Sequence, residues 1–153
     1  MVSQNQFEMA PIQGQLTLQL NTNTIPCQVD TTVVAPLVPG QPVKVVDSAG
    51  GQPKVIGAAL DTDDIFGFVN YSIKDSAFPA LAQLEISAFQ DNVMYMTAGA
   101  AIARNASVEV VIASKKVVTA ASGKRIVGRA LDKALADGDL IRVVIMLPGA
   151  LAP

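Results

Sequence analysis

Short apolar runs separated by turn residues dominate the pattern of this chain. The letters PVKVV (42–46) precede a Ser-Ala-Gly-Gly turn, KVIG (54–57) follows it, and an aspartate-rich loop then leads to IFGFVNY (65–71). Valine-rich segments on either side of such a turn predict a β-hairpin, and the third segment predicts a third strand. In that strand Phe66 and Phe68 would face one way and Gly67 and Val69 the other, because successive side chains of a strand point to opposite faces.

Four later segments have the same strand character: LEISAF (84–89), VMYMTA (93–98), SVEVVIA (107–113) and LIRVVIML (140–147). The clearest helical signal is LDKALADGD (131–139), which fits one helical turn with Asp132 near its start and Gly138 near its end. We therefore expect a mainly β fold: a small barrel-like domain built of hairpins, with one or two short helical turns.

One sequence motif occurs twice. VIGAALD (55–61) and IVGRALD (126–132) share a β-branched pair, a glycine and Ala-Leu-Asp, and each lies after a valine-rich strand. The order of segments predicts an internal pseudo-repeat over residues 39–71 and 104–147, with Gly57 aligned on Gly128. A glycine inside a strand marks a bulge, a bend or the close approach of another backbone, so we expect a bent strand in each copy.

Residues 1–35 differ from the rest of the chain, because they are rich in Gln, Asn and Thr and contain only two charged residues. A disordered tail would not carry so many large apolar side chains. The pattern instead predicts an extended arm that lies on another surface, followed by a domain over residues 36–153. The candidate contact residues of the arm are Phe7, Ile12, Leu16, Leu18 and Leu20.

Composition limits the range of functions. The chain has 153 residues, enough for one domain, and a second core is not expected. A net charge of −2, with basic residues scattered, argues against nucleic acid as a partner. The sequence has no apolar run of about 20 residues and no signal-peptide pattern at its start, so we expect a soluble protein, made in a cytoplasm, with no membrane partner.

Little catalytic chemistry fits the sequence. It has no histidine and one cysteine, Cys27, which excludes histidine-based catalysis and a cysteine-rich metal site within one chain. Asp61, Asp63 and Asp64 lack the spacing of a calcium loop and predict a solvated turn. The glycine-rich turns at 48–51 and 122–125 lack the spacing and context of a phosphate loop. We therefore predict no catalytic, cofactor or metal site.

The order of several motifs resembles a known family. PGQPVKVV, FGFV, VMYM, GKRIVGRALD and ADGDLIRV follow one another as in the small capsid decoration, or cement, proteins of tailed bacteriophages and prophages. The resemblance covers about residues 37–149, and its strongest part is C-terminal. It implies a β-rich homotrimer on the outer capsid surface of the virion, bound to the major capsid protein, with the arm lying on the capsid.

Two other classes remain open at this stage. Another phage structural part, such as a tail-tube or head-completion protein, shares self-assembling β folds. A trimeric β-rich nucleotidohydrolase has a similar length, and IGAALDTDDIFGFV is loosely similar to its aspartate segment, although its phosphate loop has no counterpart here. The decoration hypothesis predicts no enzymatic turnover.

Overall fold

The fold is mainly β, as the sequence predicts. The computed structural model describes residues 12–15, 24–47, 51–60, 63–72, 74–88 and 92–153. Within these ranges all regular structure is β, and no helix is present that could cross a membrane. The strands are β1 (Ile25–Val29), β2 (Pro42–Asp47), β3 (Lys54–Gly57), β4 (Gly67–Val69), β5 (Gln83–Ser87), β6 (Val93–Thr97), β7 (Ser107–Val111), β8 (Lys116–Thr119), β9 (Gly128–Ala130) and β10 (Leu140–Ile145).

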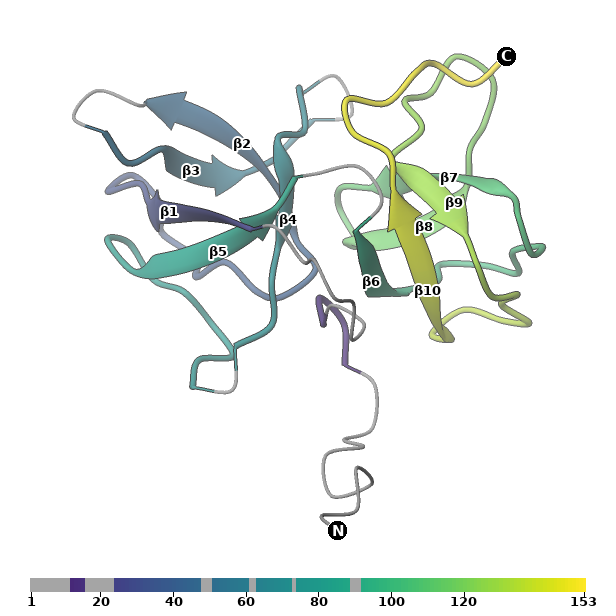
Figure 1. Ribbon diagram of the computed structural model, residues 1–153, viewed down its shortest axis with the longest axis horizontal. Coiled ribbons are helices and arrows are strands. Elements are labelled where there is room, and N and C mark those ends of the chain that lie inside the picture. The colour runs from purple at the N-terminus through teal and green to yellow at the C-terminus, as the bar shows by residue number, and fades with distance from the viewer. Residues whose placement is uncertain (1–11, 16–23, 48–50, 61–62, 73, 89–91) are drawn as a thin grey trace, which may run out of the picture.

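The strands form two sheets that lie side by side (Figure 1). Strands β1 to β5 close into a barrel in the order β1-β3-β2-β4-β5, and we call this unit the barrel. Strands β6 to β10 form the second sheet, in the order β6-β10-β9-β7-β8. The chain passes from one to the other between β5 and β6. The predicted hairpin is present, because β2 pairs antiparallel with β3.

The second sheet repeats the connectivity of the barrel strand for strand. Its outer strands β6 and β8 are linked by a parallel bridge between Ala98 and Val117, so the order around the sheet reads β6-β8-β7-β9-β10. This is the barrel order with each strand five places later in the chain. The parallel contact also corresponds, because β1 and β3 pair in parallel in the barrel while its other pairs are antiparallel.

The cross-strand pairs fix which residues correspond. Val43 in β2 pairs with Gly57 on one side and Gly67 on the other. Val108 in β7 pairs with Thr119 and Gly128 in the same way. The counterpart of Gly128 is therefore Gly67 and not Gly57, and the residue alignment expected from the repeated motif is wrong. Two short similar motifs lie on strands that occupy different places in their sheets.

The connections between strands correspond as well. An isolated antiparallel bridge joins Leu37 to Phe78 in the barrel and Ile102 to Ala134 beside the second sheet. Gly40, with φ of 78°, donates its N–H to Val69, and Asn105, with φ of 66°, donates to Ala130. A positive φ is uncommon for a residue with a side chain. Because it occurs at the matching turn in each half, the two halves share the same backbone conformation there.

The interior consists of two apolar clusters, which corrects the expectation of a single core. One cluster lies inside the barrel and the other is formed mainly by residues of the second sheet, together with Ala58 and Phe68 from the barrel half of the chain. The two clusters meet at β4, where Phe68 and Val69 alternate as the sequence predicts, but the expectation that Phe66 shares the face of Phe68 is wrong, because Phe66 packs in the barrel cluster with Val69. Val69 points into the barrel, whereas Phe68, fully buried, packs in the cluster of the second sheet.

Two further expectations are wrong. Residues 131–139 form turns around the bridge at Ala134, and not a helical turn, because Ala134 exchanges both backbone hydrogen bonds with Ile102. Strand β1 lies inside the segment 1–35 that was predicted to be an arm. It is a barrel strand in which Cys27 and Val29 are fully buried, so at least residues 25–29 belong to the folded body.

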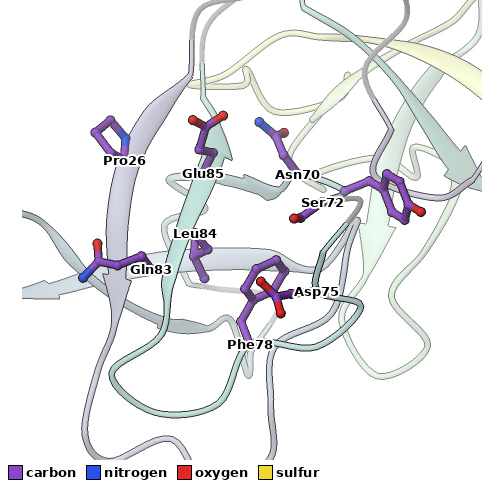
Figure 2. Close-up of a pocket in the computed structure, with 9 residues that line it drawn as sticks. Pro26, Asn70, Ser72, Asp75, Phe78, Gln83, Leu84 and Glu85 are labelled. Atoms are coloured by element: carbon purple, nitrogen blue, oxygen red, sulfur yellow. The ribbon is translucent and has the colours of Figure 1, made fainter.

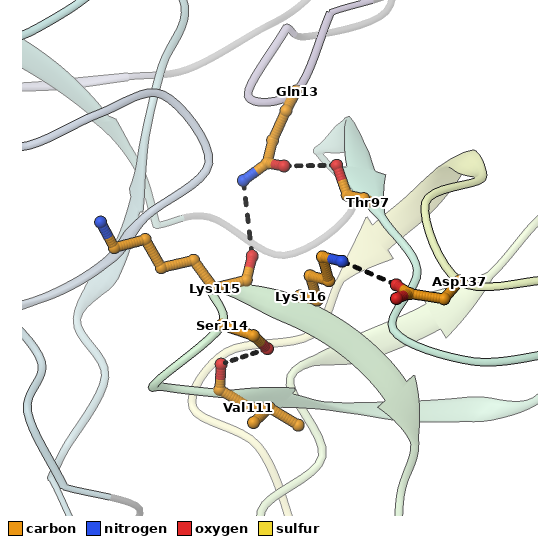
Figure 3. Close-up of polar contacts among 7 residues, drawn as sticks. All are labelled: Gln13, Thr97, Val111, Ser114, Lys115, Lys116 and Asp137. Carbon is orange, nitrogen blue, oxygen red and sulfur yellow. Dashed lines mark hydrogen bonds and ion pairs between the residues drawn. The ribbon is translucent and has the colours of Figure 1, made fainter.

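Segment 12–15 makes hydrogen bonds to both halves of the fold and lies toward the lower end of the gap between the two sheets in Figure 1. Gly14 donates its N–H to Tyr95 in β6 and accepts a hydrogen bond from the N–H of Tyr71, which follows β4. The Gln13 side chain donates to the carbonyl of Lys115 and accepts from the Thr97 hydroxyl (Figure 3). It also donates to the carbonyl of Pro39 in the barrel, so this segment links both sheets.

Candidate binding pocket

A pocket of about 370 Å³ opens on the outer side of the barrel. Its volume lies in the lower part of the range of roughly 300–1,000 Å³ that is usual for ligand sites. Strand β1, strand β5 and the connection from β4 to β5 supply its walls (Figure 2). The lining residues are Pro26, Asn70, Tyr71, Ser72, Asp75, Phe78, Gln83, Leu84 and Glu85.

Strand pairing places three of the lining residues in one row. Pro26 of β1 lies opposite Glu85 of β5, and the N–H of Asn70, just after β4, donates to the carbonyl of Glu85 at 2.9 Å. Phe78 and Leu84, both buried members of the barrel core, form an apolar floor. The position of the row is therefore fixed by main-chain hydrogen bonds, and a rigid scaffold of this kind suits recognition.

Asn70 carries an unsatisfied polar atom. The residue is 7% exposed, and its Oδ1 accepts no hydrogen bond from any described residue. A buried acceptor without a donor costs about 1–3 kcal/mol, so native structures rarely keep one. The side-chain Oδ1 of Asn70 can thus accept from a donor in the pocket once the side chain turns toward the opening, because less than 1 Å² of this atom is exposed.

The other polar groups make the pocket acidic. Figure 2 shows Glu85 beside Asn70 at one end and Asp75 beside Phe78 at the other. The Glu85 carboxylate accepts a hydrogen bond from the Thr24 hydroxyl at 2.9 Å, and the Ser72 hydroxyl accepts one from the N–H of Lys74 at 3.2 Å. Neither lysine nor arginine occurs among the described residues that line the pocket.

The second sheet has different side chains at the positions that correspond to Asn70 and Glu85. Leu131 donates its N–H to the carbonyl of Arg142 as Asn70 does to Glu85, and Arg142 lies opposite Tyr95 as Glu85 lies opposite Pro26. Leu131 thus corresponds to Asn70, and Arg142 to Glu85. An apolar side chain and a cation in the second sheet replace the amide and the carboxylate of the barrel.

Arg142 is paired within the chain. Its Nη2 and Nε atoms lie 2.7 and 2.8 Å from the two carboxylate oxygens of Asp132, which also accepts the Arg142 backbone N–H. This two-point geometry is the strong form of a carboxylate–guanidinium pair. The Arg142 side chain lowers the pKa of Asp132 below its ordinary value, and the Asp132 carboxylate raises that of Arg142.

None of the described residues singled out from the sequence lines the pocket. Ile12 lies in the segment between the sheets, Gly57 and Gly128 lie in strands, and Gly138 lies in the turn before β10 with φ of 93°. At Gly128 an added Cβ would meet the Val144 carbonyl, which is a close approach of another backbone. The remaining arm residues, Phe7, Leu16, Leu18 and Leu20, lie outside the described residues.

The structure defines the surroundings of Asp63 and Cys27, two residues considered in the sequence. Asp63 accepts hydrogen bonds from Lys44 and from the N–H groups of Ala59 and Leu60, all within 3.0 Å. Cys27 is fully buried in the barrel, and desolvation raises the pKa of its thiol to about 11. A thiol with this pKa stays protonated near neutral pH and is a poor nucleophile.

Comparison with known proteins gives a match of fold. No protein-family model matches the chain, and no curated protein matches its sequence. Among solved structures, the chain resembles the N base of head fiber gp8.5 in bacteriophage phi29 with a TM-score of 0.54 and 15% identity. The match covers 86% of this chain and 98% of that chain. A likeness at this level of identity establishes a shared fold.

Proposed function

We propose that this chain is a structural protein of a bacteriophage head, which binds the outer surface of the major capsid protein lattice as a decoration protein and stabilises the shell. The observation that carries the proposal is the fold shared with the base of a phage head fiber over 98% of that base. The order of the sequence motifs supports the same class independently. Both observations support a protein of the head.

The arrangement of the chain suits attachment rather than catalysis. Charged side chains make contacts within the chain, such as the ion pairs of Lys44 with Asp63 and of Lys116 with Asp137, each 2.7 Å long. The one cysteine is buried. Attachment of many copies, each as a trimer, would stabilise a shell by mass action and by multivalent contact.

The proposed role of the arm has to be tested without disturbing segment 12–15. A chain that begins at Ile12 keeps the contacts of Gln13 and Gly14 between the sheets and removes Phe7. A second variant, with Leu16, Leu18 and Leu20 all changed to Ser, removes the apolar side chains that follow. Both variants keep every strand and segment 12–15, so we expect them to fold like the full chain, which their melting temperatures check.

The deciding experiment is co-sedimentation with expanded capsids of the source phage that lack the protein. The full chain should pellet with a saturable stoichiometry, and both arm variants should pellet at least about tenfold less, which corresponds to about 1.4 kcal/mol of lost binding. Sedimentation velocity on the same samples measures whether the free chain is a trimer. If the full chain fails to pellet with capsids but pellets with purified tails, the head assignment is wrong.

A further inference from the structure

The acidic pocket of the barrel and its counterpart in the second sheet differ in one chemical respect. At the counterpart, the guanidinium of Arg142 is present and is held by Asp132 at 2.7 and 2.8 Å. At the pocket, Glu85 stands in place of Arg142, Asp75 adds a second carboxylate, and no cation lines the walls within the described residues. The barrel site has acceptors for a guanidinium but does not contain one.

We propose that this pocket binds an arginine side chain of the shell protein to which the chain attaches. The partner's identity rests on the proposed function, whereas the selectivity for a guanidinium follows from the pocket alone. A guanidinium has five N–H donors in a plane and no acceptor. The carboxylates of Glu85 and Asp75 and the free Oδ1 of Asn70 are all acceptors.

Asn70 provides the observation that separates this site from an ordinary acidic surface. An acidic surface is solvated, but Asn70 is 7% exposed and its Oδ1 has no donor among the residues that the structure describes. Its counterpart Leu131 shows that the same backbone position accepts an apolar residue. The backbone at this position therefore does not by itself require an amide, and the unpaired Oδ1 becomes a contact for an incoming N–H group once the side chain turns toward the opening.

The shape of the pocket also fits an arginine. Phe78 and Leu84 form the floor and Pro26 one wall, so the methylene stem of an arginine can lie on apolar surface while its head reaches the acceptors. Where Tyr95 stands in the second sheet, the barrel has the smaller Pro26. Lysine has a compact ammonium on a similar stem and meets fewer of these acceptors at once.

Selectivity can be measured on the isolated full chain by titrating ¹⁵N-labelled protein in NMR with N-acetyl-arginine N′-methylamide. The citrulline analogue is the matched control, because it keeps the shape of the side chain and loses the charge. We expect saturable shifts confined to residues 70–75 and 83–85 with the arginine analogue, and shifts at least about tenfold weaker in affinity with citrulline. Equal shifts with both compounds, or none, would overturn the proposal.

Two variants should weaken binding while the fold is kept. Asn70→Leu installs the residue found at the counterpart position, and Glu85→Gln removes one charge. Each should weaken binding of the arginine analogue about tenfold or more. Asp137→Asn makes the same charge change on an exposed loop outside the pocket and should leave binding unchanged. Saturation by CaCl₂ at the same residues, competing with the analogue, would instead indicate a cation site and contradict a guanidinium site.

The source of the arginine is tested by co-sedimentation with the capsids. Asn70→Leu and Glu85→Arg should reduce pelleting at least about tenfold, while Asp137→Asn pellets like the unchanged chain. If these pocket variants pellet normally but change the oligomeric state in sedimentation velocity, the arginine comes from a second copy of this chain, and the shell assignment is wrong. If the full chain itself does not pellet, the proposed function fails, while the NMR result still decides what the pocket selects.

Discussion

Leu81 and Gly138 occupy the same position in the two sheets. Leu81 donates its backbone N–H to the carbonyl of Val29, the last residue of β1, and Gly138 donates to the carbonyl of Ala98, the residue after β6. Both hydrogen bonds are 2.9 Å long. Each also has a positive φ, 65° for Leu81 and 93° for Gly138. One turn is therefore built with glycine, which adopts this region without strain, and the other with a leucine that does not.

Exchanging these residues should change stability in opposite directions. Leu81 is 56% exposed, so Leu81→Gly loses little packing and relieves the left-handed strain, and we expect it to raise the free energy of unfolding by about 0.5 kcal/mol. Gly138→Leu should lower it by about 1–2 kcal/mol, although an added Cβ meets no atom within 4 Å. Urea unfolding measures both. A destabilised Leu81→Gly would mean that the leucine packs on a partner surface in solution.

The unsatisfied amide of Asn70 predicts a gain of stability on its removal. Asn70→Leu replaces a buried acceptor that has no donor with the apolar residue of the matching position, Leu131. We expect the free energy of unfolding to rise by about 1–2 kcal/mol, and the melting temperature by roughly 2–4 °C per kcal/mol. Glu85→Gln, on the same row but exposed, is the control and should change stability by less than about 0.5 kcal/mol. An unchanged or lower stability of Asn70→Leu would show that the amide has a structural partner.

Segment 12–15 should couple the stability of the two sheets. At Gly14, with φ of 78°, an added Cβ would lie 2.8 Å from the Pro39 Cβ, so Gly14→Ala should displace the segment. We expect a loss of about 2 kcal/mol or more, the sum of backbone strain and overpacking. Amide exchange at Tyr71 and Tyr95, which donate to this segment, should become faster.

A control glycine separates the two causes of that loss. Gly123 has nearly the same φ, 77°, but open space around an added Cβ. Gly123→Ala should therefore show only the strain of about 1–2 kcal/mol and leave exchange at Tyr71 and Tyr95 unchanged. If both alanine variants behave alike, the segment does not hold the sheets together in solution.

The sequence predicts where the strands lie better than it predicts which strands pair with each other. The hairpin of β2 and β3 and the alternation of Phe68 and Val69 follow from local periodicity, which depends on neighbouring residues only. The pairing of β7 with β9 depends on contacts between distant residues. The local sequence similarity therefore aligned Gly57 with Gly128, although the hydrogen-bond register makes Gly67 the counterpart of Gly128.

The pocket was missed for a related reason. Asn70 continues the alternation that places Phe68 on a buried face, so a polar residue at an apolar position was the signal available in the sequence. The meaning of that signal depends on Glu85 and Asp75, which are brought near by strand pairing and by a loop. No spacing rule relates these three residues, and the contrast with Arg142 becomes visible only once the two sheets are compared in register.

Asp63 should make the protein lose stability in acid. The hydrogen bond from the Lys44 ammonium, together with those from the N–H groups of Ala59 and Leu60, lowers the pKa of Asp63 to about 2. Because the pKa in the folded state is lower than the value of about 3.9 in an unfolded chain, the carboxylate stabilises the fold above pH 4. This contribution is lost as the pH falls from about 4 to about 2.

The comparison that isolates this effect is the unchanged chain against Asp63→Asn, by urea unfolding from pH 6 to pH 2. The unchanged chain should be more stable at pH 6, and the difference should close between pH 4 and pH 2, since asparagine cannot titrate. Lys44→Met removes the largest cause of the lowered pKa of Asp63. Stability should then depend less on pH between pH 4 and pH 2. Part of the dependence should remain, because the N–H groups of Ala59 and Leu60 still donate to the carboxylate. Parallel curves for the unchanged chain and Asp63→Asn would mean that Asp63 titrates alike in the folded and unfolded states, so that its three hydrogen bonds do not favour the ionised carboxylate.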